Sequence, residues 1–244
     1  MIHSLIMADD STHEHRQAIT TMSELVTLSE NDLCRSLTHV FWLGGPSDSG
    51  KTSVMNIIVQ RRRWQRYPCD FHEHNHLIAR ADPILHPVIY QSIGRSLDET
   101  WLHPTPQQLF EHILATNDER FPMICDDLRL TPRKPPVLVE GPRLFPKLVV
   151  PVLTSLNQAI WLIPTADFAH ASQERRDKPS GRYGSSNPER LRENFLARER
   201  LLAEYIESEV ARLGLHSIKV DGQRTAEEIA DEVEAHFATY TAYV

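Results

Sequence analysis

The sequence predicts an α/β fold in which five parallel strands form one sheet with helices on both faces. Short apolar runs alternate along the chain with longer segments of helical spacing. These runs are nearly continuous, as in strands that are buried on both faces of a parallel sheet. A glycine-containing turn joins the first run to the next helical segment. In such a sheet, ligands bind at the carboxyl ends of the strands, and this rule directs the search for a site.

Residues that typically begin or end helices and strands indicate where the individual elements lie. The five predicted strands span residues 38–44, 66–70, 137–139, 159–163 and 216–220. One helix follows Lys51, a second begins near Phe145, and a third runs from about Pro188 to Leu213, where Gly214 is well placed to end it. The last predicted helix spans residues 225–237 and begins with a capping-box sequence.

The length of 244 residues suits one sizeable domain with appendages. We expect residues 37–244 to form that domain and residues 1–36 to form a helical or partly disordered N-terminal extension. Within the domain, a helical insertion interrupted by prolines occupies about residues 72–130. A candidate lid at about residues 174–190 is rich in Pro, Gly, Ser and Asn.

The composition restricts the class of partner and the compartment. The formal net charge is -7, whereas a general binder of nucleic acid is usually basic, so nucleic acid is not the expected partner. The three cysteines form no C-x-x-C pair, which favours a reducing compartment. The first residues lack the pattern of a signal peptide, and no apolar stretch is long enough to span a bilayer. We therefore expect a cytoplasmic protein that does not associate with membranes.

The turn after the first strand carries the most specific motif in the chain. Its residues match G-x-x-x-x-G-K-[ST] at every fixed position: Gly45, Pro46, Ser47, Asp48, Ser49, Gly50, Lys51 and Thr52, with Ser53 following. Glycines let the backbone turn tightly, so that N–H groups face phosphate oxygens, and the N-terminus of the next helix adds positive charge. We expect Lys51 to reach the β- and γ-phosphates of a nucleoside triphosphate and Thr52 to bind Mg2+.

Two carboxylates stand at the predicted ends of neighbouring strands. Asp70 ends the second strand and Glu140 the third, which brings both near the γ-phosphate. We expect Asp70 to act as general base toward an acceptor and Glu140 to hold Mg2+ or organise its water. The reverse assignment stays open. So do a helix cap for Asp70 and a turn carboxylate without catalytic role for Glu140.

These features together resemble the small-molecule kinases of the phosphate-loop (P-loop) superfamily. The Glu140-Gly141 pair after a short apolar strand looks like uridine kinase and phosphoribulokinase, and Asp70 looks like the aspartate of shikimate kinase, gluconate kinase and chloramphenicol phosphotransferase. Asp221-Gly222, before a capped helix, is similar to the adenine-side loop of nucleoside and nucleotide kinases. The arrangement over residues 38–237 also resembles uncharacterised bacterial P-loop proteins that are often labelled "AAA family ATPase".

The resemblance implies a three-layer P-loop NTPase fold and an ATP-dependent phosphotransferase that uses Mg2+. In such kinases, a mobile lid carries arginines that clamp the phosphates. The candidates here are Arg175, Arg176 and Arg182 in the lid and Arg198 on the following helix. Arginine suits this role because its planar fork bridges two phosphate oxygens while it neutralises developing charge. Asp221 would lie beside the adenine.

Several alternatives stay open at this stage. The chain could be a nucleotide-dependent switch or ATPase that acts through a protein partner, or it could bind nucleotide without turnover. Trp101, Phe110 and Phe121 in the insertion either stack on a ring-shaped acceptor or pack in the core of the insertion. His72 and His76 border an acceptor pocket, lie on the surface or bind a metal. The sequence identifies neither the acceptor nor the oligomeric state.

Overall fold

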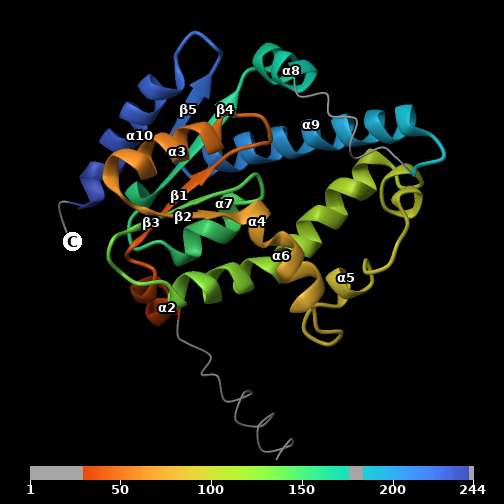
Figure 1. Cartoon of the computed structure of the whole chain (residues 1–244), viewed down its shortest axis with the longest axis horizontal. Coiled ribbons are helices and arrows are strands. Elements are labelled where there is room, and N and C mark those ends of the chain that lie inside the picture. Colours follow the sequence, from red (N-terminus) through yellow and green to blue (C-terminus); the bar gives the residue numbers. More distant parts are fainter. Residues whose placement is uncertain (1–29, 176–183, 242–244) are drawn as a thin grey trace, which may run out of the picture.

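A computed structural model of the chain describes residues 30–175 and 184–241. Its five strands form one all-parallel sheet in the order β2-β3-β1-β4-β5, which confirms the predicted α/β class (Figure 1). The strands are Val40–Gly44 (β1), Gln65–Pro68 (β2), Val137–Glu140 (β3), Ala159–Pro164 (β4) and Ser217–Val220 (β5). The helices between them include Lys51–Arg62 (α3), Pro106–Leu130 (α6), Pro188–Arg212 (α9) and Ala226–Thr241 (α10).

Alternate residues of the central strands face two separate hydrophobic clusters. In β1, Val40 and Trp42 join the cluster that α6 and α9 cover, whereas Phe41 and Leu43 join the cluster under α3 and α10. Figure 1 shows α3 and α10 on one side of the sheet and α6 and α9 on the other. The central strands are therefore buried on both faces, as their continuous apolar runs predicted.

The residues between β2 and β3 form a largely helical segment. It contains Cys69–His74 (α4), the π-helix Asn75–Ala79 (η1), Pro87–Tyr90 (α5), the π-helix Asp98–Leu102 (η2) and α6. The capping box of Thr105 and Gln108 starts α6, because each side chain bonds a backbone N–H of the other residue. Asp127 of α6 binds Tyr67, His76 and Arg80, which fastens β2, η1 and the residue after η1 to the long helix.

Several predicted boundaries differ from those in the structure. The second strand was predicted to end at Asp70, but it ends at Pro68, and Asp70 lies in the first turn of α4. Pro68 is tolerated there because β2 is an edge strand, and its missing N–H cannot extend the ladder. The helix predicted near Phe145 is the short Pro146–Val149 (α7), since Pro151 follows within one turn.

The remaining predicted elements lie close to their expected places. Thr225 and Glu228 form the predicted capping box, and Gly214, with a φ of 63°, follows the end of α9. Of the N-terminal extension, Glu30–Ser36 (α2) is helical and residues 1–29 lie outside the described part. No helix within residues 30–175 and 184–241 is long and apolar enough to cross a membrane.

Candidate functional site

The motif of residues 45–52 forms a tight turn between β1 and α3. Gly45, Asp48 and Gly50 have positive φ angles of 135°, 63° and 86°. A side chain at Gly45 is excluded, because its Cβ would lie 2.3 Å from the carbonyl oxygen of Leu162. Asp is one of the residue types that tolerate the left-handed conformation, which accounts for Asp48 within the turn. Residues in this conformation turn successive N–H groups to one side, an arrangement that binds anions.

Lys51 places its ammonium inside this turn. The side chain is buried, and Nζ donates to the carbonyl oxygen of Pro46 at 2.6 Å and to Ser49 Oγ at 3.2 Å. Burial lowers the pKa of Lys51 from 10.5 to about 8, although nearby carboxylates, with Glu140 and Asp70 foremost, raise it. Lys51 therefore remains mostly protonated at neutral pH and supplies a desolvated positive charge at the N-terminus of α3.

Glu140 and Thr52 meet next to Lys51. Thr52 Oγ1 donates to Glu140 Oε1 at 3.1 Å, and the carboxylate is 5% exposed at the carboxyl end of β3. Burial raises the pKa of Glu140, and the charge of Lys51 opposes this shift. No group of three or more His, Cys, Asp or Glu side chains that could hold a metal occurs among the described residues. A hydroxyl and a carboxylate supply oxygen ligands, which Mg2+ prefers together with waters and phosphates.

Close backbone packing brings Asp70 to the same edge of the sheet. A Cβ on Gly141 would lie 2.8 Å from Cys69 Cβ, so only glycine allows the end of β3 to approach α4 this closely. The buried Arg120 donates to the carbonyl oxygen of Cys69 and fixes the start of α4. Asp70 itself is exposed, and its charge acts on both Lys51 and Glu140. The structure thus brings Lys51, Asp70 and Glu140 together, as the sequence predicted.

A cavity of about 230 Å³ lies beside the turn, and we call it the loop chamber. Pro46 and Ser47 of the turn line it together with Asp70. Arg143, which follows β3, and Arg198 of α9 line it as well. The turn that carries Lys51 therefore borders a cavity with acidic and basic side chains.

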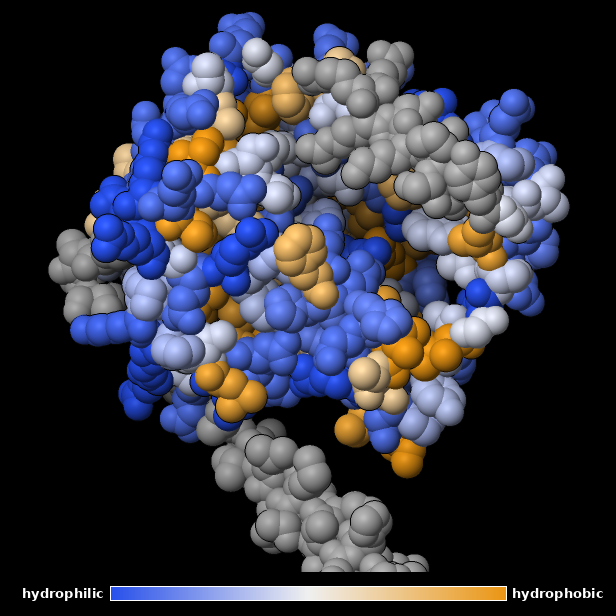
Figure 2. Space-filling model, viewed as in Figure 1, coloured by the Kyte–Doolittle hydropathy of each residue, from blue (hydrophilic) through white to orange (hydrophobic). Residues whose placement is uncertain are grey.

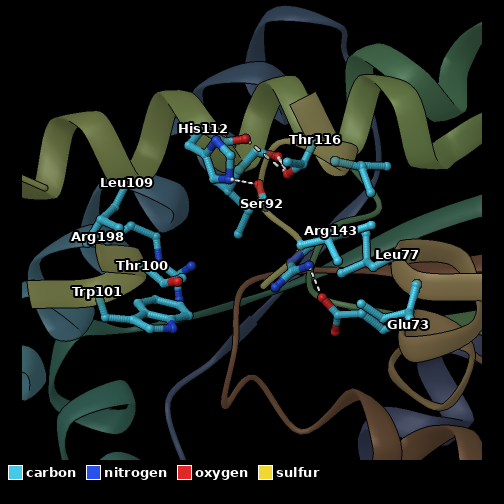
Figure 3. A pocket seen from close by; sticks show the side chains of 14 residues that line it. Glu73, Leu77, Ser92, Thr100, Trp101, Leu109, His112, Thr116, Arg143 and Arg198 are labelled. Carbon is cyan, nitrogen blue, oxygen red and sulfur yellow. Dashed lines mark hydrogen bonds and ion pairs between the residues drawn. The ribbon is translucent and has the colours of Figure 1, made fainter. Parts of the chain in front are cut away.

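Each of the two arginines is paired with a carboxylate. Arg143 Nη1 bonds Glu73 Oε1, and about a quarter of each side chain is exposed (Figure 3). Arg198 Nη2 lies 2.6 Å from Glu199 Oε1, and this pair is almost fully buried. The Arg198 guanidinium also lies 4.7 Å from the centroid of the Trp101 ring and 4.9 Å from that of Phe195, within the range of cation–π attraction.

Two buried asparagines hold the backbone of this wall. Asn194 Nδ2 donates to the carbonyl oxygens of Trp101, Leu102 and Pro104, which ties η2 to α9. Asn117 Nδ2 of α6 donates to the carbonyl oxygen of Arg143 at 2.8 Å. Trp101 and Arg143 are thereby fixed by elements far from them in sequence.

The other predicted site residues lie apart from the loop chamber or outside the described part. Ser53 is exposed in the first turn of α3. Asp221 follows β5, is exposed and accepts the N–H of Gln223 in its own turn. Arg175 ends Ala166–Arg175 (α8), but its side chain is outside the description, as are Arg176 and Arg182. Among the clamp candidates, Arg198 is the one whose side chain the structure describes.

The structure separates the roles of the aromatic residues in the insertion. Phe121 is buried against Trp42, and Phe110 packs edge-on against Tyr205, so both belong to the core. Trp101, by contrast, is half-buried and lines the loop chamber. The stacking alternative therefore survives for Trp101 alone of these three.

The two histidines of the insertion also pack against protein groups. His72 stacks on Tyr67 with ring centroids 4.1 Å apart. The buried His76 bonds Asp127 at 2.8 Å and Arg120 Nε at 3.3 Å. They are held by neighbouring side chains within the described part of the chain and form no metal cluster there.

Sequence reasoning missed three residues of this wall: Glu73, Arg143 and Glu199. Arg143 stands three positions after Glu140 and Glu199 directly follows Arg198, so proximity to predicted site residues was an available signal. The pairing of Arg143 with Glu73 joins residues 70 positions apart, and only the packed insertion shows it.

No known protein family and no curated protein sequence matches the chain. The sheet order and the turn of residues 45–52 are consistent with P-loop NTPases, but the order alone is not specific to them. The function is therefore inferred from the geometry of the site.

Proposed function

We propose that the chain is an ATP-dependent phosphotransferase of the P-loop kinase type, which transfers the γ-phosphoryl group of ATP to a small-molecule acceptor. One observation carries the proposal: the turn that holds the buried Lys51 opens onto a cavity lined by Asp70, Arg143 and Arg198. A phosphate site beside a cavity lined by charged side chains places donor and acceptor next to each other, which is the main requirement for phosphoryl transfer.

Each group at the sheet edge then has a distinct role. Lys51 and the backbone of residues 45–50 bind the β- and γ-phosphates, and Thr52 with Glu140 holds Mg2+, which neutralises phosphate charge when bound. Asp70 accepts the proton of the acceptor hydroxyl. The acceptor oxygen forms a bond to the γ-phosphorus, the bond from that phosphorus to the bridging oxygen breaks, and ADP leaves.

Arg198 is a suitable clamp for the transferred group. Its Nε is buried and has no hydrogen-bond partner among the described residues, although its Nη2 bonds Glu199. A buried donor without a partner costs about 1–3 kcal/mol, and a ligand oxygen in the loop chamber would recover that cost. Arg176 and Arg182 of the proposed lid stay candidates for the same role.

The decisive experiment measures acceptor-dependent consumption of ATP. Purified protein with ATP and Mg2+ is incubated with a library of small hydroxyl compounds, and hits are checked by mass spectrometry for a gain of one phosphoryl group. Lys51→Ala should abolish transfer with an unchanged circular dichroism spectrum, because it removes the central charge of the phosphate site. Lys147→Ala, which removes an exposed partner of Asp118, is the matched control and should retain activity.

The result also separates the kinase from a nucleotide switch. Consumption of ATP that rises only with a small acceptor supports the proposal. Slow hydrolysis that a protein partner stimulates, without dependence on any acceptor, would favour the switch and overturn it. Full transfer activity in Lys51→Ala would overturn the proposed mechanism.

A further inference from the structure

The loop chamber adjoins a second cavity of about 250 Å³, which we call the distal chamber; Figure 3 shows the side chains that line it. The two share five lining residues: Glu73, Trp101, Ile113, Arg143 and Arg198. These shared residues form the boundary between the two chambers, and we call this boundary the passage. Together the chambers offer space in the range of small-molecule sites, about 300–1,000 Å³.

The distal chamber is mainly apolar away from this passage. Leu77, Ile78, Ile89, Ile93 and Leu109 supply its hydrophobic walls. No Asp, Glu, Lys or Arg occurs among the described residues that line the distal chamber and not the loop chamber. A molecule that binds in this chamber is stabilised by the burial of its apolar surface.

The polar groups of the distal chamber are neutral and already bonded within the protein. Ser92 Oγ lies 2.9 Å from the carbonyl oxygen of Val88 and 3.0 Å from His112 Nε2, and Thr116 Oγ1 donates to the carbonyl oxygen of His112 at 2.9 Å. Figure 3 shows His112 and Thr116 on the same helix, with Ser92 beside His112. Burial lowers the pKa of His112, with Arg95 and Arg143 adding to the shift, so the imidazole is uncharged at neutral pH.

The charged passage also does not favour a second anion beside the γ-phosphoryl group that Arg198 is proposed to clamp. Arg143 is paired with Glu73 and Arg198 with Glu199, and Asp70 adds a further negative charge to the loop chamber. Because Arg198 is proposed to bind the γ-phosphoryl group and Arg143 is paired with Glu73, a carboxylate or phosphate on the acceptor would find no further arginine to bind it. It would also face the three acidic side chains. A neutral hydroxyl meets no such repulsion and can bond Asp70.

We propose that the acceptor is a neutral amphipathic alcohol, with its hydroxyl in the loop chamber and an aromatic or aliphatic body in the distal chamber. This inference rests on the proposed function for the fate of the hydroxyl. The binding of the apolar body depends on the two chambers alone. Phosphorylated acceptors, nucleotides and carboxylic acids are the classes that it excludes.

The test is a binding experiment that needs no turnover. The full chain is titrated with N-phenyl-1-naphthylamine, a neutral aromatic probe that fluoresces in apolar surroundings. The bound probe is then displaced with 3-phenyl-1-propanol, 3-phenylpropanoic acid or 3-phenylpropyl phosphate. We expect saturable binding at one site and displacement by the alcohol at a concentration about tenfold or more below that of either anion. Stronger displacement by an anion would overturn the inference.

A matched pair of variants locates the probe. Thr116→Phe fills the distal chamber, whereas Thr239→Phe changes an exposed threonine of α10 that makes a comparable bond to a carbonyl oxygen of its own helix. We expect Thr116→Phe to weaken the binding of the probe about tenfold or more and Thr239→Phe to leave it unchanged. Equal binding in the two variants would overturn the inference.

A second variant covers the case in which Thr116→Phe does not fold. Ile93 is 40% exposed at the rim of the distal chamber, so the Ile93→Glu variant should fold. The substitution places a charge on an apolar wall and should therefore weaken the binding of the probe. Unchanged binding in a folded Ile93→Glu would count against the inference. ATP affinity, measured separately, should not change in any of these variants.

Transfer to an anionic acceptor would overturn this inference alone, whereas alcohol binding without transfer to any acceptor would overturn the proposed function alone.

Discussion

The loop chamber and the distal chamber adjoin, but different parts of the chain build them and their walls differ in charge. Pro46 and Ser47 of the turn before Lys51 line the first chamber, together with acidic and basic side chains. The helical segment between β2 and β3 builds most of the second, and six Leu and Ile side chains line it. The sheet edge is suited to electrostatic stabilisation of a reacting group, and the helical segment is suited to selecting an apolar molecule.

The helical segment also differs from the sheet on its outer surface. Seven large hydrophobic residues of this segment are at least 40% exposed: Phe71, Ile78, Ile84, Leu85, Tyr90, Ile93 and Leu130. Figure 2 shows hydrophobic surface gathered on the side of the molecule where Figure 1 places α5. The strands β1, β3 and β4, by contrast, are buried almost throughout. The comparison leads us to expect that substitutions at the sheet edge change chemistry and charge balance, whereas those in the distal chamber change affinity for the acceptor.

After the loss of transfer in Lys51→Ala, the largest expected effect is on turnover and comes from Asp70. Asp70→Asn removes the proposed base, so kcat for an identified acceptor should fall about 100- to 10,000-fold. The affinity for ATP, measured by calorimetry, and the affinity of the distal chamber for the neutral probe should stay close to those of the wild type. Asp231→Asn, in an exposed pair with Arg61, is the control for the change from aspartate to asparagine. Equal losses in turnover and ATP affinity would instead place Asp70 at the nucleotide.

The next largest effect is on stability, and it should differ between the two arginine–carboxylate pairs. Glu199→Gln leaves the buried Arg198 without its counter-charge, and we expect it to lower the free energy of unfolding by about 3–5 kcal/mol. In the other pair, 23% of the Arg143 side chain and 28% of the Glu73 side chain are exposed. Glu73→Gln should therefore lower the free energy of unfolding by about 1 kcal/mol or less. Urea denaturation of both variants measures the difference. Similar losses would show that burial does not distinguish the two pairs.

Local sequence signals predicted the sheet edge well because each of its parts is encoded within a few residues. The turn from Gly45 to Thr52 is set by its glycines and by the N-terminus of α3. Glu140 was expected near the turn because the carboxyl ends of parallel strands share one edge. Asp70 was placed one element too early, since Pro68 ends the strand, but its neighbourhood was predicted correctly.

The distal chamber could not be predicted from such signals. Its walls come from segments with little sequence periodicity, among them two short π-helices and α5. The positions of Trp101 and Arg143 depend on Asn194 and Asn117, which bond backbone carbonyls 26 to 93 residues away. Nothing near Trp101 in sequence separates it from Phe110 or Phe121, and only tertiary packing assigns Trp101 to the cavity and the other two to the core.

The last prediction uses pH to test whether the charge of Lys51 is desolvated at the sheet edge. Burial lowers the pKa of Lys51 to about 8 in the folded chain from 10.5 when exposed. Between these two values the unfolded chain binds a proton at Lys51 that the folded chain has lost, so unfolding takes up protons and stability rises with pH. Below about pH 8 both states are protonated, and the cost of the buried charge is present in full.

The measurement compares the wild type with Lys51→Met, in which this titration is removed and the other groups are retained. The free energy of unfolding of the wild type minus that of the variant should increase by up to about 3 kcal/mol between pH 8 and 10.5. A constant difference over this range would mean that the ammonium is hydrated in the folded chain. ATP should reduce the slope, because phosphate charge next to Lys51 raises the pKa of its ammonium. A slope that ATP leaves unchanged would separate Lys51 from the nucleotide and remove the reason to place the phosphates at the turn.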